Sequence, residues 1–225
     1  MHFNSINESV TEIRNSLPAG VMLVAAAKTR SPEEVQAAIH AGIKILGYNY
    51  LQEAERIYQT IGDTVQWHMI GHLQRNKVKN AVDLFDMIET IDTIKLAEEV
   101  NKRCAAISKI MPVLIEINSG KELNKTGVLP ENVDKLVKQI SSLPNLRVQG
   151  LMTMGPRFGN PEDARQYFKD TKFAFDRLSK AGIPNVEMCY LSMGMSNSYK
   201  IAIEEGANIV RVGTKLFGER SYQRY

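Results

Sequence analysis

Eight short apolar runs alternate with longer amphipathic stretches, and this alternation restricts the fold of the 225-residue chain more than any other feature. Glycine, proline or polar residues flank most of the runs, as is usual for strands buried in a parallel sheet. The runs cover residues 21–27, 43–48, 65–70, 86–91, 112–118, 147–154, 186–193 and 208–213. Helical patterns lie between them at 32–41, 50–61, 74–84, 93–108, 131–143, 161–181 and 198–206, and an eighth pattern at 5–16 precedes the first run.

Residues typical of helix ends support these boundaries. Ser31-Pro32-Glu33-Glu34 places a capping serine, a first-turn proline and acidic residues in the order that favours a helix start. At helix ends a left-handed residue is favoured, and glycines stand there after four helical stretches: Gly42, Gly62, Gly182 and Gly206.

The order of elements predicts the α/β class, a single (β/α)8 TIM barrel with an extra N-terminal helix, and one domain over residues 1–225. An open doubly wound sheet is the structural alternative. It is disfavoured because no Gly-x-Gly-x-x-Gly motif follows the first strand, which runs into Ala27-Lys28-Thr29 instead.

Composition excludes several other classes. A net charge of +3 with 44% hydrophobic residues is ordinary for a globular protein and excludes disordered and collagen-like chains. No apolar run approaches the roughly 20 residues of a membrane span, and the first residues lack the pattern of a signal peptide. We therefore expect a cytoplasmic protein without a membrane partner, and we expect Cys104 and Cys189 to be reduced and buried. The small net charge does not indicate nucleic acid, and we expect Arg75, Lys77 and Lys79 to form a solvated helix face.

In barrels of this kind the functional residues follow the strands, at their carboxyl ends. Lys28 ends the first predicted strand and precedes a helix start. A partly desolvated amine at the barrel mouth is a nucleophile toward aldehydes. The alternative is a structural lysine that only extends its amine to solvent.

The last two predicted strands end in residues suited to bind an anion. Ser196 is expected to cap the helix at 198–206, so that free backbone amides point outward. Gly213 allows a close approach of the backbone, and Thr214 adds a hydroxyl. Loops after strands seven and eight commonly hold phosphate in such barrels, although ordinary turns use the same residues.

Arg211 lies inside the eighth apolar run, where its charge needs a partner, and a structural ion pair would supply one.

Other polar residues give weaker indications. His68 and His72 would be about 13 Å apart along a strand, too far to share a metal, and we predict no metal site. Tyr48-Asn49-Tyr50 ends the second strand, where a ring would pack either on a planar ligand or in the core.

These residues together resemble the pyridoxal-phosphate homeostasis proteins, a fold-type III group similar to the N-terminal barrel of alanine racemase. The resemblance covers nearly the whole chain. Its motifs are Ala27-Lys28-Thr29, Gly47-Tyr48-Asn49-Tyr50-Leu51-Gln52-Glu53, Trp67-His68-Met69-Ile70-Gly71-His72-Leu73-Gln74-Arg75-Asn76-Lys77, Gly150-Leu151-Met152-Thr153-Met154, Ser192-Met193-Gly194-Met195-Ser196, and Arg211-Val212-Gly213-Thr214 with Phe217-Gly218.

The resemblance implies that pyridoxal 5'-phosphate is the cofactor and that Lys28 forms the internal aldimine with it. It implies a phosphate site made by Ser196, Gly213 and Thr214, with Arg211 facing the pyridine nitrogen, and it places Asn49 in a motif that lines the pocket. Because an arginine does not give up its proton, the ring would be a weak electron sink. That property suits a protein that holds the cofactor.

Three residues depart from the family pattern. The family commonly has glutamate at Tyr48, serine at Ala27 and aspartate at Ser198. We expect the change at Tyr48 to alter the polarity of the pocket, and the change at Ser198 to weaken a helix cap.

Three functions are compatible with these residues. The first, which we favour, is a non-catalytic, monomeric carrier in intracellular pyridoxal-phosphate homeostasis, with apo-enzymes that need the cofactor as candidate partners. The second is an amino-acid racemase. It needs a second base, which in alanine racemase comes from a separate domain; only seven residues follow Gly218, so Tyr48 or Tyr50 would have to serve. The third is a phosphosugar aldolase that uses Lys28 and a neighbouring acid–base pair.

Overall fold

The computed structural model describes residues 2–122, 125–156 and 159–219. Within them, eight parallel strands form a closed barrel in sequence order, and β1 pairs with both β2 and β8. The prediction of a TIM barrel is therefore confirmed. The strands are β1 (Met22–Ala26), β2 (Ile45–Tyr48), β3 (Gln66–Met69), β4 (Met87–Ile91), β5 (Met111–Ile117), β6 (Leu146–Thr153), β7 (Val186–Ser192) and β8 (Ile209–Val212).

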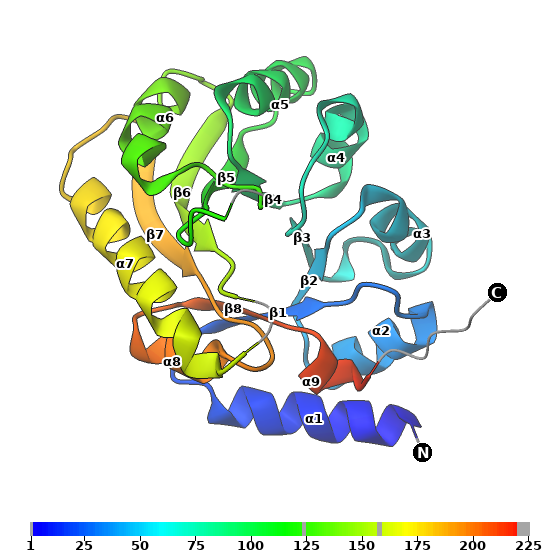
Figure 1. Cartoon of the computed structure of the whole chain (residues 1–225). Coiled ribbons are helices and arrows are strands. Elements are labelled where there is room, and N and C mark those ends of the chain that lie inside the picture. Colours follow the sequence, from blue (N-terminus) through cyan, green and yellow to red (C-terminus); the bar gives the residue numbers. More distant parts are fainter. Residues whose placement is uncertain (1, 123–124, 157–158, 220–225) are drawn as a thin grey trace.

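Helices surround the barrel, and the predicted N-terminal helix lies outside this ring beside α2 and α9 (Figure 1). The helices are α1 (His2–Ser16), α2 (Pro32–His40), α3 (Leu51–Ile61), α4 (Val78–Leu84), α5 (Ile94–Ala106), α6 (Val133–Ile140), α7 (Arg165–Ser179), α8 (Tyr199–Glu204) and α9 (Thr214–Phe217). Short 3-10 turns stand at η1 (Gly62–Thr64), η2 (Arg75–Lys77), η3 (Pro130–Asn132) and η4 (Pro161–Ala164). None of the helices in the described ranges is long and apolar enough to cross a membrane.

The predicted boundaries differ from the observed ones in two ways. The patterns at 74–84, 131–143 and 161–181 each divide into a 3-10 turn followed by a shorter helix. Helix α9 was not predicted, because four residues are too few to show a helical period. The start of α2 is as predicted, since the Ser31 hydroxyl and the Glu34 carboxylate form a reciprocal capping box.

Alternation along the strands creates two separate layers of side chains. Outward-facing residues form the main core between the barrel and the helices. Inward-facing residues form a smaller apolar floor inside the barrel: Val24, Ile45, Ile70, Met87, Leu114, Met152 and Ile209. Toward the carboxyl ends of the strands the same inward face becomes polar, with Glu89, Glu116 and Arg211 each two residues beyond a floor residue. This change from apolar to polar sets the chemistry of the barrel mouth.

The two cysteines are free, as predicted, but they lie in different surroundings. Cys104 is buried in α5. Cys189 is exposed, so its predicted burial was wrong. It alternates along β7 with the partly buried Met188 and Tyr190, and Glu187, two residues before it, is exposed as well.

Candidate cofactor site

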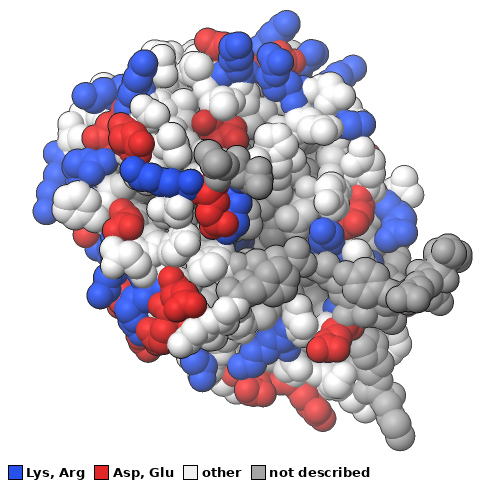
Figure 2. All heavy atoms as spheres, in the orientation of Figure 1, with Lys and Arg blue, Asp and Glu red and all other residues white. Residues whose placement is uncertain are grey.

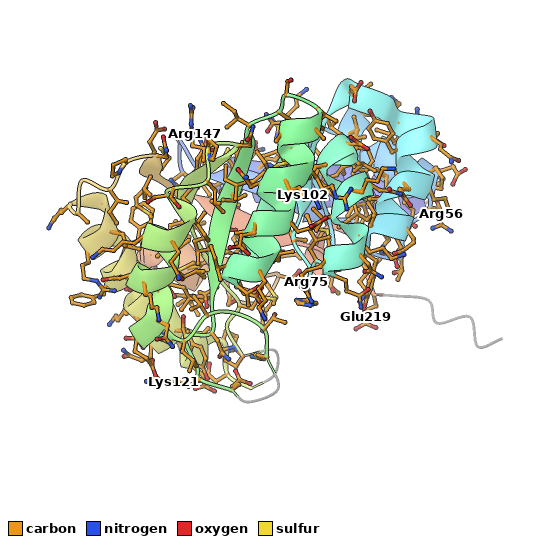
Figure 3. All side chains as sticks on the ribbon, turned by 90° about the horizontal axis from the view of Figure 1, so that it is seen from above. Arg56, Arg75, Lys102, Lys121, Arg147 and Glu219 are labelled. Atoms are coloured by element: carbon orange, nitrogen blue, oxygen red, sulfur yellow. The ribbon has the colours of Figure 1, made fainter. Side chains whose placement is uncertain are left out.

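Lys28 lies at the carboxyl end of β1, two residues beyond Ala26 on the inward face. Its side chain is half-buried, and its Nζ atom lies 4.8 Å from the centroid of the Tyr50 ring. A cation over an aromatic face is attracted to the ring. Figure 3 shows the two ends of the barrel: Lys121, which follows β5, lies at one end, and Arg147, near the start of β6, lies at the other. Lys28 follows β1 and therefore belongs to the end of Lys121, because the strands are parallel.

The segment after Lys28 is tied to distant parts of the chain. Thr29 has a φ of +67°, which is unusual for a β-branched residue, and its N–H donates to Glu53 Oε2 at 3.2 Å. Arg30 is buried, donates to the carbonyl of Gly218 and lies over the Phe217 ring. The backbone around the lysine is therefore held from α3 on one side and from α9 on the other.

The loops after β7 and β8 meet at Ser196. Its hydroxyl accepts hydrogen bonds from the backbone N–H groups of Gly213, at 3.2 Å, and Lys215, at 3.3 Å. A Cβ atom on Gly213 would lie 3.1 Å from the carbonyl oxygen of Ala26. Thr214 is exposed and begins α9. The structure thus brings Ser196, Gly213 and Thr214 together beside β1.

Ser196 does not cap α8, so that part of the prediction was wrong. Ser198 occupies the N-cap position, and its hydroxyl accepts a hydrogen bond from Met195 N rather than from the helix. Residues 196–198 form a turn before the helix, so α8 begins at Tyr199, one residue later than the sequence pattern predicts. The same contact shows that the Ser198 side chain, aspartate in the family pattern, does not cap the helix.

Arg211 crosses the barrel interior, where several buried polar groups contact it. Its guanidinium donates to the Ser192 hydroxyl and, at 2.8 Å, to the carbonyl of Thr153. Glu89 Oε2 lies 3.8 Å from the same guanidinium and accepts from Ser192 at 2.6 Å. On its other side, Glu89 Oε1 lies 2.7 Å from His68 Nδ1. The ion pair expected for Arg211 is present, and it belongs to a chain of four buried polar side chains.

Two buried glutamates carry opposite pKa shifts. Burial acts to raise the pKa of the Glu89 carboxyl, but His68, Arg211 and Ser192 outweigh it and hold this pKa below its ordinary value. Burial raises the pKa of the Glu116 carboxyl, and the charge of Asp92 adds to the effect. Glu116 Oε1 accepts from the Thr126 hydroxyl at 2.8 Å, whereas its Oε2 has no hydrogen-bond partner among the described residues.

Sequence reasoning missed both glutamates, although a signal for them was present. Each interrupts an apolar run, 86–91 for Glu89 and 112–118 for Glu116. The same feature drew attention to Arg211, and a buried charge needs a partner whichever sign it has.

The expectation that Tyr48 alters the pocket was wrong. Its side chain is fully buried outside the barrel and stacks on Trp67 with ring centroids 5.6 Å apart. Gly47 takes the inward position on β2, because side chains alternate along a strand. Ala27 also belongs to the outer core. Neither departure from the family pattern therefore touches the barrel mouth.

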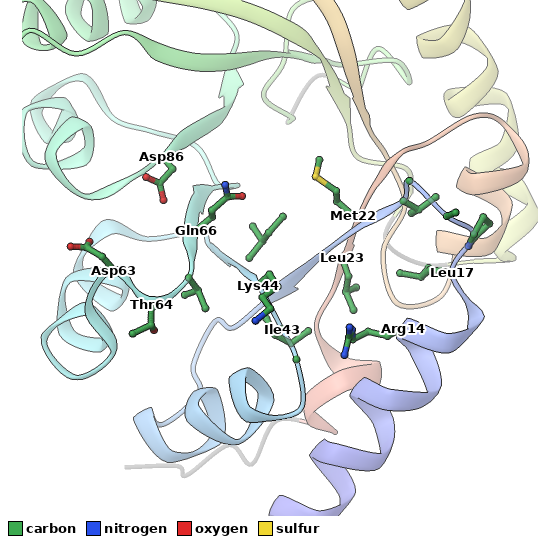
Figure 4. Close-up of a pocket in the computed structure, with 17 residues that line it drawn as sticks. Arg14, Leu17, Met22, Leu23, Ile43, Lys44, Asp63, Thr64, Gln66 and Asp86 are labelled. Carbon is green, nitrogen blue, oxygen red and sulfur yellow. The ribbon is translucent and has the colours of Figure 1, made fainter.

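Two cavities lie at opposite ends of the barrel. One of about 420 Å³ lies at the mouth and is lined by Asn49 and Tyr50 among others. The other, of about 900 Å³, lies at the amino ends of β1 to β3, where Arg14, Lys44 and Asp63 line it (Figure 4). It contains none of the predicted site residues.

On the face shown in Figure 2, acidic and basic side chains are interspersed, as expected from the small net charge.

The residues at the mouth fit a small aldehyde that carries a phosphate. Lys28 offers an amine, Arg211 a buried guanidinium at the base, and Ser196, Gly213 and Thr214 a group of hydroxyls and backbone amides. Hydroxyls and backbone amides of this kind bind phosphate, and an amine condenses with an aldehyde. Within the described residues, no group of three or more histidine, cysteine or acidic side chains is arranged to hold a metal ion.

Comparison with known proteins gives a consistent result. The profile of the family "Alanine racemase, N-terminal domain" matches residues 2–221. The pyridoxal phosphate homeostasis protein of Aquifex aeolicus is 44% identical over 201 residues, which are 89% of this chain and 87% of that protein. The protein of the same name from Schizosaccharomyces pombe is 37% identical over 91% of this chain and 86% of its own length. This chain belongs to the pyridoxal phosphate homeostasis protein family.

Solved structures agree with the membership. PipY of Synechococcus elongatus, solved without pyridoxal phosphate, is 30% identical and superimposes with a TM-score of 0.89 over 95% of this chain and all of PipY. PipY with pyridoxal phosphate bound gives a TM-score of 0.87. An alanine racemase variant structure gives 0.81 at 17% identity, and this chain covers 57% of it, which shows the shared barrel fold. The family resemblance predicted from the sequence is confirmed.

Proposed function

We propose that this chain binds pyridoxal 5'-phosphate at the barrel mouth, with its aldehyde attached to Lys28, and that it serves pyridoxal-phosphate homeostasis without turning over a substrate. One observation carries the proposal. Ser196 joins the loops after β7 and β8, and Gly213 of this junction packs against Ala26, two residues before Lys28. An amine and a cluster of hydroxyl and backbone amide groups therefore follow neighbouring strands, which supports a site for an aldehyde that carries a phosphate. The family names of the relatives and the ligand of PipY support the choice of cofactor.

Each residue of the site has a proposed task. Bound pyridoxal phosphate supplies an aldehyde that condenses reversibly with amines. Lys28 provides the amine, and the junction of Ser196, Gly213 and Thr214 holds the phosphate. Arg211 presents a fixed positive charge to the ring nitrogen, and Asn49 lines the mouth beside it. Because an arginine retains its proton, this site is suited to hold the cofactor rather than to stabilise a carbanion.

A racemase remains the second candidate, and the positions of two tyrosines bear on it. Racemisation needs a second base on the face of the substrate opposite to the lysine. Tyr48 faces the outer core, and Tyr50 lies directly beside Lys28. Neither tyrosine is placed across the site from Lys28, which favours the carrier. A single-domain monomer in the cytoplasm, with apo-enzymes as recipients, stays a prediction from the sequence.

The experiment that tests the proposed function combines retention of the cofactor with turnover. The purified chain, mixed with pyridoxal phosphate and passed through a desalting column, is expected to stay yellow. The loaded protein is then incubated with L-alanine and other L-amino acids, and the enantiomers are separated. A carrier gives no D-amino acid above the level of free pyridoxal phosphate, whereas steady turnover would establish the racemase instead. A colourless protein would contradict both.

A further inference from the structure

A cavity of about 420 Å³ lies at the barrel mouth beside Tyr50, whose ring contacts the Lys28 amine. It lies between the turn from β2 to α3 and the segment from β3 to η2. Its volume falls in the range of small-molecule sites. Apolar side chains, Leu51, Met69 and Leu73, form part of its wall. The polar part of the wall consists of Asn49, Gln52, His72, Gln74 and Lys77.

Three of these five polar side chains, Gln52, His72 and Gln74, are exposed to solvent, and Asn49 and Lys77 are half-buried. Among the described residues, none of the five makes a side-chain hydrogen bond or an ion pair. Nearby, by contrast, Asn80 donates to Glu55 at 3.0 Å and is satisfied. Lys77 is half-buried, and a partly desolvated cation without a counter-charge favours the binding of an anion. The sequence predicted Arg75, Lys77 and Lys79 on one solvated helix face. Arg75 and Lys79 are exposed, whereas Lys77 is half-buried and is the one of the three that lines the cavity.

The floor of the cavity is fixed backbone. Gly71 is buried, and a Cβ atom on it would lie 2.4 Å from the carbonyl oxygen of Asn49. The carbonyl of Gly71 in turn accepts from the buried Thr90 hydroxyl at 2.7 Å. The segments after β2 and β3 therefore pack closely beneath the cavity, and the segment after β3 is also tied to β4. A rigid floor positions a ligand without a large ordering cost.

The cavity is also joined to the cofactor site. Tyr50 lines it, and the ring of Tyr50 carries the Lys28 amine at 4.8 Å. Asn49 belongs to the cavity and, by the proposed function, to the cofactor pocket as well. A molecule in the cavity is thus separated from the Lys28 amine by a single aromatic ring.

The chemistry of the lining selects the ligand. A lysine ammonium and three side-chain amides donate hydrogen bonds, an imidazole can also donate, and no carboxylate is among the described residues that line the cavity. Building on the function proposed above, we propose that this cavity holds the phosphate or carboxylate group of a small molecule that is approaching or leaving Lys28. Both groups are oxyanions that such donors bind. The phosphate would belong to incoming pyridoxal phosphate, and the carboxylate to an amino acid that receives the cofactor.

The direct test needs no covalent cofactor, so its failure is distinct from failure of the proposed function. The side-chain resonances of 15N-labelled histidines are followed while the apo-protein is titrated with inorganic phosphate or with acetate, and His72→Asn identifies the His72 signal. We expect a saturable shift of His72. Lys77→Gln weakens this binding about tenfold, as expected for loss of a charged hydrogen bond. Lys79→Gln, an exposed neighbour on the same segment, leaves it unchanged. Absence of a shift, or equal weakening in both variants, overturns the proposal.

The kinetics of attachment to Lys28 then distinguish the two sources. If the phosphate of the cofactor uses the cavity, Lys77→Gln slows attachment of pyridoxal phosphate several-fold and leaves attachment of pyridoxal unchanged. If the carboxylate of an acceptor uses it, the same variant slows release of the cofactor to glycine and leaves release to methylamine unchanged. Unchanged rates with all four compounds contradict the proposal.

Discussion

Inside the barrel, a few charged side chains stand directly above an apolar floor, and their pairing determines what the mouth can do. Glu89 is the central one, because it faces both His68 and the guanidinium of Arg211. The cost of placing an arginine here is offset by this carboxylate and by two neutral acceptors, the Ser192 hydroxyl and the Thr153 carbonyl. Arg211 is thereby held in one position.

Glu89→Gln tests this pairing. The substitution keeps the size of the side chain but leaves the buried guanidinium without its counter-charge, and we expect a loss of about 3 kcal/mol in the free energy of unfolding. The control is Glu99→Gln, which breaks an ion pair with Arg103 on the surface of α5 and should change the free energy of unfolding far less, because solvent screens this pair. Urea unfolding of both variants at neutral pH measures the difference. Equal losses would show that Glu89 does not compensate Arg211.

Glu116 makes the pH dependence of stability unusual. Its pKa in the folded protein is raised, so the folded state keeps this proton at pH values where the unfolded chain has lost it. Stability then falls as the pH rises from the unfolded pKa toward the raised folded pKa. Glu116→Gln removes this loss. The variant should gain stability relative to the wild type between about pH 4 and neutral pH, and the gain should level off above the raised pKa.

Unfolding curves at several pH values check this prediction. Glu99→Gln is again the control, because the pKa of Glu99 is lowered and the sign of its pH dependence is opposite. A stability difference for Glu116→Gln that does not change with pH would show that Glu116 is ionised in the folded protein.

At the level of the elements, the strands and most of the helices were predictable, and the loop after β7 was not. Buried parallel strands are short, continuous apolar runs, and the eight runs correspond to the eight strands of the described residues. The loop after β7 was misread because a turn at residues 196–198 precedes α8, and the Ser196 hydroxyl accepts from the loop after β8 instead of capping the helix. A hydrogen bond to another loop leaves no local sequence pattern.

Gly71→Ala tests how firmly the ends of β2 and β3 are joined. The added methyl group would meet backbone atoms of Asn49 at 2.4 and 2.5 Å, and backbone cannot move aside as a flexible side chain does. We expect the free energy of unfolding to fall by about 1–3 kcal/mol and the affinity for pyridoxal phosphate to decrease. Gly155→Ala is the control, because the nearest atoms to its Cβ, at 3.0 Å and beyond, are side-chain carbons. Thermal unfolding and cofactor titration of both variants measure the effects, and equal behaviour would contradict the prediction.

At the scale of the whole molecule, closure of the barrel brings the first and last βα units together. The pairing of β1 with β8 places Lys28 beside the loop that begins α9. Arg30 strengthens the same junction through the carbonyl of Gly218 and the ring of Phe217. The sequence order alone predicts this neighbourhood once the barrel is assumed. The role of Arg30 was not foreseen, because its partner lies 188 positions away.

Arg30→Met tests whether this contact holds α9 in place. Methionine keeps most of the apolar contact and removes the hydrogen bonds to Gly218 and Glu34. We therefore expect the free energy of unfolding to fall by about 2 kcal/mol. Amide exchange at Leu216 and Phe217 should become faster. Arg103→Met, which breaks only the surface pair with Glu99, should leave both amides unchanged. Unchanged exchange in Arg30→Met would show that α9 is held by the apolar contacts of its buried side chains.

The most direct measurement is to locate the covalent cofactor. The chain is mixed with pyridoxal phosphate, reduced with borohydride and digested, and the peptides are mapped by mass. We predict a pyridoxyl adduct on Lys28, its loss in Lys28→Ala with little change in thermal stability, and its retention in Lys44→Ala, an exposed lysine at the opposite end of the barrel. An adduct on other lysines alone, or no adduct at all, would contradict the assignment of Lys28 as the residue that holds the cofactor.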